Sequence, residues 1–175
     1  FKSLGKPNLF FGVTGGDMGS PIKPFTAGFR IPSEDAYTPH AKPGARPDRS
    51  VIVYSQRCRE AYYETPIVIG GIEASLRRIA QYDYWSDKVR RSILIDANAD
   101  VLLFGNAERA LAELAHQLAH GRKPEDLWDL RGTAFVKDSL PEKWTEIDSS
   151  RIDWPAKIDK IPNPYDFHNN EKSTK

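Results

Sequence analysis

Three short apolar runs, each of which ends in glycine or runs into it, constrain most strongly what this chain can fold into. They lie at residues 8–13, 66–70 and 100–105, and a weaker fourth candidate follows at residues 133–137. The first three runs are continuously apolar and do not alternate between apolar and polar residues. Continuous apolar strands with glycine at the exit are typical of a parallel sheet that is buried on both faces.

Helical patterns lie between these runs. From Pro47 onward, apolar residues recur at spacings of three and four, which predicts an amphipathic helix with proline in its first turn. Its apolar face would hold Val51, Tyr54, Cys58, Ala61 and Tyr62. Residues 87–96 favour another helix, although residues 92–95 alternatively fit a strand.

The clearest helix is predicted over about residues 107–120, where one stripe carries Leu111, Leu114, Ala115 and Leu118 and Gly121 ends the pattern. The alternation of strand and helix predicts an α/β fold, with a Rossmann-like, mostly parallel, doubly wound sheet flanked by helices and right-handed crossovers.

Two regions interrupt this alternation. Residues 15–46 carry many glycines and prolines without sustained periodicity, which predicts a long irregular insertion. Residues 151–175 predict an extended, proline-containing arm that leads from a domain at residues 1–150 to another domain. Because the first residue is Phe1 rather than Met and a strand-like run follows closely at residues 8–13, we interpret the start as a boundary and not as a biological terminus.

Charge and cysteine content narrow the function classes. The 175 residues include 25 basic and 24 acidic side chains, a net charge of +1, so bulk charge gives no reason to expect nucleic acid or an anionic membrane surface. No apolar stretch approaches the roughly 20 residues that span a bilayer. The single cysteine, Cys58, excludes an internal disulfide and a cysteine-built metal cage within these residues, and favours a reducing, cytoplasmic setting.

Candidate site residues follow the apolar runs, since ligands of open α/β sheets bind beyond the carboxyl ends of the strands. The candidates for binding a ligand or cofactor are Gly70, Gly71, Glu73, Ala74, Ser75, Gly105, Asn106 and Glu108. Glycine allows close approach to the backbone, and helix N-termini favour phosphate or carboxylate. Ser75 and Glu108 are the expected polar contacts, and Arg77 or Arg78 would balance an anion. In the alternative interpretation the glycines only make tight turns.

The sequence resembles a known family at these residues. Pro66-Ile-Val-Ile-Gly-Gly-Ile-Glu-Ala-Ser75 and Ala99-Asp-Val-Leu-Leu-Phe-Gly-Asn-Ala-Glu108 are similar to the second half of the cobalamin-binding-type domain that precedes many radical S-adenosylmethionine barrels. Longer strings resemble the N-terminal region of the YgiQ-like radical S-adenosylmethionine proteins, and the likeness extends to about Tyr165. Those strings are Gly5-Lys-Pro-Asn-Leu-Phe-Phe-Gly-Val-Thr14, Asp35-Ala-Tyr-Thr-Pro39, Arg46-Pro-Asp-Arg49, Gly70-Gly-Ile-Glu-Ala-Ser-Leu-Arg-Arg78 and Tyr82-Asp-Tyr-Trp-Ser-Asp87.

The resemblance implies a parent protein whose downstream barrel holds a 4Fe-4S cluster on a Cys-x-x-x-Cys-x-x-Cys motif and cleaves S-adenosylmethionine. Three thiolates hold such a cluster, and Cys58 is interpreted as a small buried hydrophobe, so no catalytic residue and no metal ligand is assigned here. The expected role is an accessory domain that binds a ligand or covers the barrel of the same polypeptide. Cobalamin stays an open alternative, because Asp166-Phe-His168 lacks the glycine of the Asp-x-His-x-x-Gly loop.

Two further hypotheses for the function of the chain stay open. One is a stand-alone domain that binds a small ligand or nucleotide. The other is a nucleic-acid module, in which basic side chains interleave with aromatic ones. Those residues are Arg77, Arg78, Lys88, Arg90, Arg91, Tyr82, Tyr84 and Trp85. Glu113, His116 and His120 share a helix face and are candidate metal ligands, but a solvated polar face is the preferred interpretation.

Overall fold

The computed structural model describes residues 1–15, 38–42, 45, 47, 49–84, 86–139, 142 and 144. The chain divides into one unit over Phe1–Asp138 and a second over Ser139–Lys175, and all helices and strands given below belong to the first. Most of the predicted insertion and all of the predicted arm lie outside the described residues. Both assignments, and the boundary after residue 150, stay predictions.

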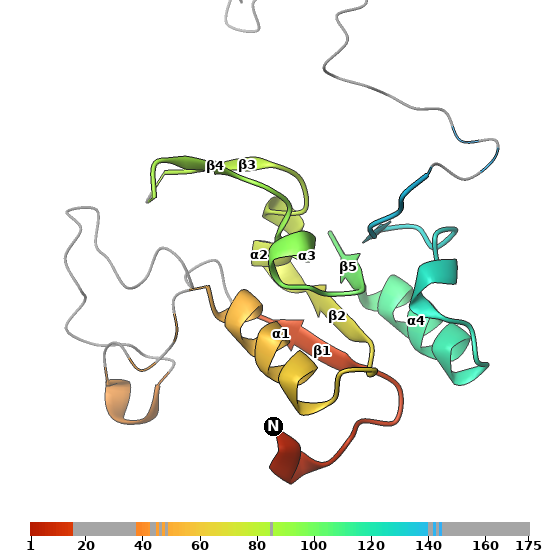
Figure 1. The fold of residues 1–175 in the computed structure, drawn as a ribbon, viewed down its shortest axis with the longest axis horizontal. Helices are drawn as coiled ribbons and strands as arrows, with labels where there is room; N and C mark the ends of the chain where they lie inside the picture. The colour runs from red at the N-terminus through yellow and green to blue at the C-terminus, as the bar shows by residue number, and fades with distance from the viewer. Residues whose placement is uncertain are drawn as a thin grey trace, which may run out of the picture. The chain divides into compact units, whose positions relative to one another are not determined.

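A four-stranded sheet forms the centre of the first unit (Figure 1). It consists of β1 (Phe11–Thr14), β2 (Ile67–Gly70), β5 (Val101–Leu103) and β6 (Thr133–Ala134), in the order β1-β2-β5-β6. The first three strands are parallel, and β6 pairs antiparallel with β5 at the edge. Strands therefore form at all four predicted runs, and the prediction of a mostly parallel sheet is confirmed.

The two faces of β2 show why its sequence is continuously apolar. Ile67 and Ile69 pack into one hydrophobic cluster and Val68 packs into another on the opposite face, and all three are buried. A strand that is covered on both faces has no position at which a polar side chain would reach water, so the alternation of a half-exposed strand is absent.

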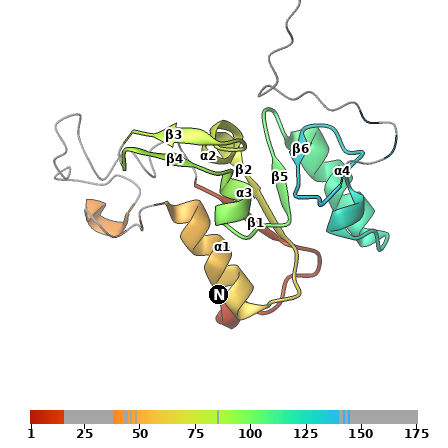
Figure 2. The ribbon, with the colours of Figure 1, turned by 45° about the horizontal axis from the view of Figure 1, so that its top comes forward.

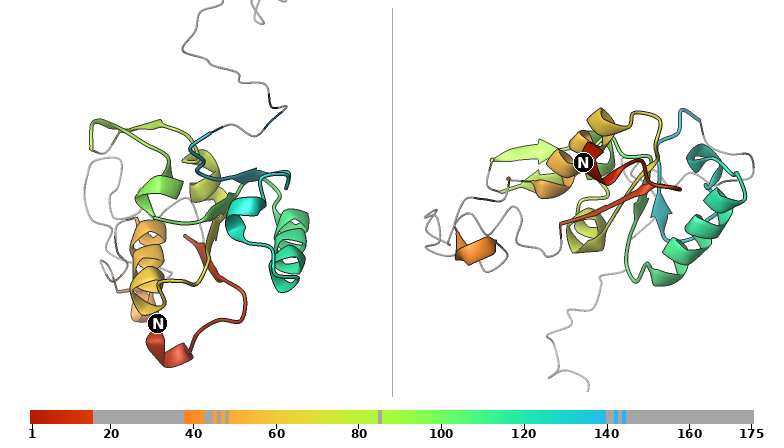
Figure 3. Two further views of the ribbon diagram at one scale, coloured as in Figure 1. Left: turned by 45° about the vertical axis from the view of Figure 1, so that its right-hand side comes forward. Right: turned by 90° about the horizontal axis from the view of Figure 1, so that it is seen from below.

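Helices cover both faces (Figures 2 and 3). α1 (Ser50–Ala61) and α3 (Ile93–Asp96) contribute to the cluster that contains Ile67 and Ile69, whereas α4 (Glu108–Ala119) contributes Leu114 to the cluster of Val68. This layering confirms the expectation of a sheet flanked by helices. The described strands follow chain order across the sheet, so they contain no reversal of strand order.

Two details of the predicted helices are corrected by the structure. α1 begins at Ser50, after Arg49 in a left-handed conformation, so Pro47 precedes the helix and does not lie in its first turn. In α4, Leu114 is fully buried but Leu111 is 42% exposed, because it lines an open cavity together with residues of β1, β2 and β5.

A β-hairpin replaces the first part of the helix that the sequence favoured at residues 87–96. β3 (Gln81–Asp83) pairs antiparallel with β4 (Lys88–Arg90), and only Ile93–Asp96 is helical, so the strand alternative at residues 92–95 is also wrong. The Ser92 side chain accepts a hydrogen bond from the Leu94 N–H and begins α3. The hairpin is held by an ion pair within it and by a long-range ion pair to Arg49, described below, which no local pattern reveals.

The remaining elements are short. α2 (Gly71–Leu76) follows β2 without a break, and 3-10 turns occur at Lys2–Leu4, Pro39–Ala41 and Pro124–Asp126. None of the helices in the described part of the chain has the length and hydropathy that a membrane crossing requires.

Candidate functional site

The turns that follow β1, β2 and β5 share one edge of the sheet, as the sequence predicts. Thr14 lies opposite Gly70 in the register of β1 and β2, and Gly105 follows shortly after β5. Gly16, which follows the first apolar run of the sequence, lies outside the described residues. The carboxyl ends of the parallel strands therefore bring Thr14, Gly70 and Gly105 to one place.

Gly71 makes the turn from β2 into α2 and brings it close to β1. Its φ is +86°, in the region that favours glycine, and a Cβ added there would lie 2.5 Å from Thr14 Oγ1. Both the backbone conformation and the neighbouring strand thus require glycine at this position.

Ser75 connects two of the glycine turns. Its hydroxyl donates to the Gly71 carbonyl at 2.8 Å and accepts a hydrogen bond from the Gly105 N–H at 3.2 Å. This side chain therefore fastens α2 to the loop after β5. Its predicted role as a ligand contact stays a prediction.

Glu73 and Ala74 face inward. Ala74 is fully buried and belongs to the cluster on the α1 face, and Glu73 is only 4% exposed. The Arg77 guanidinium lies 3.2 Å from Glu73 Oε1, one helical turn away. The charge of Arg77, a candidate for balancing an anion, is therefore already matched by a carboxylate of α2.

Asn106 and Glu108 lie at the start of α4 and are exposed. No side chain caps this helix at Ala107, and Glu108 in the first turn complements the helix dipole. Arg78 stacks over the Phe104 ring, 5.0 Å from its centroid, and donates to the Ser75 carbonyl. The structure thus gathers Gly70, Gly71, Ser75 and Gly105, while Asn106 and Glu108 flank them.

An apolar cavity of about 370 Å³ opens beside these glycines. It is lined by Gly12 of β1, by Gly70 and Gly71 at the end of β2, and by Leu103 of β5 and Leu111 of α4. Gly12 contributes no side chain over β1, so the sheet is bare at this point. The cavity is able to take a small apolar group.

One exposed feature of this edge was not identified from the sequence. Ile72, Leu76 and Ile79 are 55%, 60% and 64% exposed, and they follow one another at spacings of four and three along α2 and the turn after it. We call these three residues the α2 apolar surface. The helical spacing was visible in the sequence, but the nearby glycine motif drew the interpretation toward a ligand.

The hairpin carries a buried ion cluster around Asp83. Asp83 Oδ2 lies 2.6 Å from Arg49 Nη2 and 2.6 Å from Arg90 Nε, and the carboxylate also accepts a hydrogen bond from Ser86. Burial acts to raise the pKa of Asp83, but the Ser86 and Arg90 hydrogen bonds and the Arg49 charge outweigh it and hold the pKa at about 2. The cluster joins the hairpin to the start of α1.

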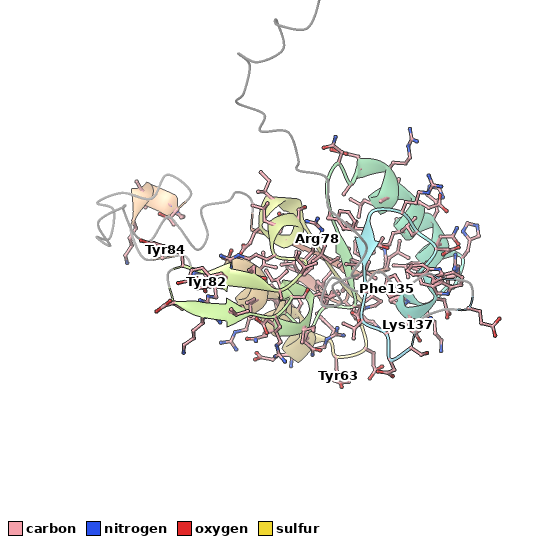
Figure 4. The ribbon with its side chains drawn as sticks, turned by 90° about the horizontal axis from the view of Figure 1, so that it is seen from above. Tyr63, Arg78, Tyr82, Tyr84, Phe135 and Lys137 are labelled. Carbon is pink, nitrogen blue, oxygen red and sulfur yellow. The ribbon has the colours of Figure 1, made fainter. Side chains whose placement is uncertain are left out.

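The basic and aromatic residues around the hairpin were candidates for binding nucleic acid. Tyr82 and Tyr84 of this group are labelled in Figure 4. Arg77, Arg90 and Arg91 each pair with a carboxylate of the fold, and the Tyr82 hydroxyl donates to Asp87. Trp85 lies outside the described residues. Internal pairing leaves few free cations for a nucleic-acid backbone on this part of the surface.

Metal-ligating side chains do not cluster in the described part of the chain: no group of three His, Cys, Asp or Glu residues there is arranged to hold a metal ion. On α4, Glu113 accepts a hydrogen bond from Gln117, and the His120 ring contacts the His116 carbonyl. Cys58 is buried in the core, and burial raises the pKa of its thiol. It is a core residue, as the sequence predicts.

Comparisons with known proteins identify the family. A family model described as "Radical SAM N-terminal" matches residues 1–172. Proteins named UPF0313 protein are similar to this chain: 63% identical over 165 residues in Pseudomonas syringae pv. tomato and 64% over 165 residues in Pseudomonas putida. A Vibrio cholerae protein of the same name is 63% identical over 166 residues.

Each alignment covers at least 94% of this chain but only 21–22% of the relative, so the chain spans about a fifth of the length of these relatives. No solved structure matches the chain.

Proposed function

The chain belongs to the radical S-adenosylmethionine N-terminal family, and we propose that it is the accessory domain of a radical enzyme, docked through the α2 apolar surface on the rest of the polypeptide. The rest of the polypeptide would contain the iron–sulfur barrel that the family likeness implies. Docking at this edge would cover the mouth of the barrel and keep water from the radical chemistry inside.

The α2 apolar surface carries this proposal. Each of its three aliphatic side chains is more than half exposed, and burying one would contribute on the order of 1 kcal/mol. The best polar groups of the same edge are already engaged within the domain: Ser75 with Gly71 and Gly105, and Arg77 with Glu73. An edge with satisfied polar groups and exposed aliphatic ones suits a protein surface better than a polar ligand.

The residues of this chain do not fit the cluster itself. Three thiolates are needed, and the chain offers only the buried Cys58. Cluster and S-adenosylmethionine binding are accordingly assigned to the part of the relatives beyond this domain, and we derive no step of the reaction from this chain.

The activity of the parent is tested on the full-length protein, reconstituted anaerobically with iron and sulfide. Bound iron and the 5′-deoxyadenosine released from S-adenosylmethionine under reducing conditions are quantified. We expect cluster assembly and cofactor cleavage. Well-folded protein that binds no cluster would remove the assignment to a radical enzyme.

Docking is tested by replacing Ile72, Leu76 and Ile79 together with serine in the full-length protein. Limited proteolysis should release the N-terminal domain several-fold faster, while bound iron stays unchanged because its ligands lie elsewhere. The matched control replaces Leu4 and Val136, which are also exposed, with serine. Equal proteolysis of the two variants would contradict docking at α2 without affecting the enzyme assignment.

The apolar cavity supports a second candidate, a ligand-binding domain of the Rossmann-like, cobalamin-binding type. Its volume of about 370 Å³ is at the small end for a ligand site and would hold only part of a large cofactor. Titration of the full-length protein with hydroxocobalamin, followed by absorbance and co-elution in gel filtration, tests this candidate. Saturable binding that Gly71→Leu abolishes would favour it, and absence of binding would remove cobalamin.

A further inference from the structure

A second, larger cavity lies away from the α2 apolar surface, between α4 and the segment that leads into β6. Its volume is about 560 Å³, within the range of roughly 300–1,000 Å³ that small-molecule sites occupy. Phe104, Ala110, Leu127 and Leu130 supply apolar walls, and Leu127 is almost fully buried. The cavity thus has a fixed apolar floor.

Hydrogen bonds hold the loop that forms one wall. Arg122 Nη2 lies 2.9 Å from Asp129 Oδ1, and the same guanidinium contacts the Asp126 carbonyl. The hydrogen bond from Arg122 lowers the pKa of Asp129. Arg122 therefore stabilises the loop, and its charge is already paired with Asp129 and is not available to a ligand.

Two other arginines that line the cavity, Arg109 and Arg131, differ in their pairing from the other arginines of the described residues. Among the ten arginines of the described residues, seven pair with a carboxylate and Arg78 stacks on Phe104. Arg109 and Arg131 are the two for which the described residues provide no carboxylate and no hydrogen-bond acceptor. Both of these unsatisfied cations line the same cavity.

The remaining polar groups of the cavity do not cancel this charge. Glu113 follows Arg109 by one helical turn, but they form no ion pair, and a Glu113 carboxylate oxygen accepts from Gln117 at 2.6 Å. Asn106 adds a side-chain amide near the uncapped start of α4. Guanidinium forks match the planar oxygen pairs of phosphate and carboxylate.

We propose that this cavity binds a small molecule that carries a phosphate or carboxylate group and an apolar body. Arg109 and Arg131 hold the anionic group, and the body packs against Phe104, Leu127 and Leu130. A cavity of this size favours a small molecule over a single acidic side chain of the rest of the polypeptide. The site is separate from the α2 apolar surface, so it does not depend on the proposed docking.

The test is isothermal titration of the full-length protein with four probes: inorganic phosphate, phenyl phosphate, benzoate and benzyl alcohol. Phenyl phosphate or benzoate should bind saturably and more tightly than inorganic phosphate, while benzyl alcohol, which lacks the anion, should not. The affinity should fall as salt concentration rises.

Variants assign the binding to the cavity. Arg109→Gln combined with Arg131→Gln should weaken the binding at least tenfold, and the corresponding lysine variants, which keep the charge but lose the fork, should weaken it less. Arg57→Gln, at an exposed arginine of α1, is the matched control and should bind the probes with the affinity of the unsubstituted protein. The proposal is overturned if the glutamine double variant binds equally well, or if neither anionic aromatic probe binds. The latter result would favour pairing of both arginines with acidic residues elsewhere in the polypeptide.

Discussion

The hydroxyl of Ser75 accepts a hydrogen bond from the backbone N–H of Gly105, thirty residues further along the chain, at 3.2 Å. The same hydroxyl donates to the Gly71 carbonyl, so one small side chain joins the turns that follow two neighbouring strands. The edge of the sheet where a ligand or partner is expected is therefore fixed by an internal contact.

Replacing Ser75 with alanine should lower the free energy of unfolding by about 1–2 kcal/mol, because both hydrogen bonds are lost. Chemical denaturation measures this difference. Ser3→Ala, at an exposed position of the first 3-10 turn, is the control and should change stability by less than about 0.5 kcal/mol. An unchanged midpoint for Ser75→Ala would show that the contact contributes nothing.

Gly71→Ala should destabilise the protein more than Gly121→Ala. Both glycines have a φ near +85°, so each substitution costs about 1 kcal/mol of backbone strain. Only at Gly71 would the new Cβ also overlap Thr14 Oγ1, at 2.5 Å, whereas nothing lies within 4 Å at Gly121. Combining Gly71→Ala with Thr14→Ala should recover part of the loss in a double-mutant cycle. Strict additivity would show that the two positions are not in contact.

Acid should loosen the hairpin over a defined pH range. The folded-state pKa of Asp83, about 2, is below the value of about 3.9 for an unfolded aspartate, so the ionised carboxylate stabilises the fold at and above pH 4. That contribution should disappear as the pH falls from about 4 to 2. Asp83→Asn should remove this part of the pH dependence and cost about 2 kcal/mol at neutral pH, since Arg49 and Arg90 lose their counter-charge. Chemical denaturation of both proteins between pH 2 and 7 measures the effect, and parallel profiles would contradict it.

The pair Arg59–Asp100 should contribute more than the pair Arg57–Glu60 on the same helix. Asp100 Oδ2 lies 2.7 Å from Arg59 Nη2 and also accepts the Ile67 N–H at 2.6 Å, which joins α1 to the start of two strands. The Arg57 and Glu60 side chains are 60% and 63% exposed, and water screens such pairs. Double-mutant cycles with alanine should give a coupling of about 1 kcal/mol or more for the first pair and less than about 0.5 kcal/mol for the second. Equal couplings would contradict the argument from burial.

The parallel sheet was predictable because its signal is local. Ile67, Val68 and Ile69 are apolar in succession, and a strand buried on both faces is the usual setting for such a run. The position of α4 was predictable for the same reason, since its apolar stripe and Gly121 lie within one stretch of chain. The hairpin of β3 and β4 was not predictable from the sequence, because Asp83 is paired with Arg49, which is distant in sequence.

By itself, the sequence determined the three strands, the shared edge of their glycine turns and the family of the chain, because each depends on residues that are adjacent or regularly spaced. Only the tertiary structure decided what each side chain of that edge does. Within the six residues of α2, successive side chains rotate by about 100°, so Ile72 faces outward while Glu73 and Ala74 turn into the core. Which arginines stay unpaired among the described residues was likewise decided in three dimensions: Arg109 and Arg131 line a cavity whose walls come from the segment after β5, from α4 and from the loop before β6.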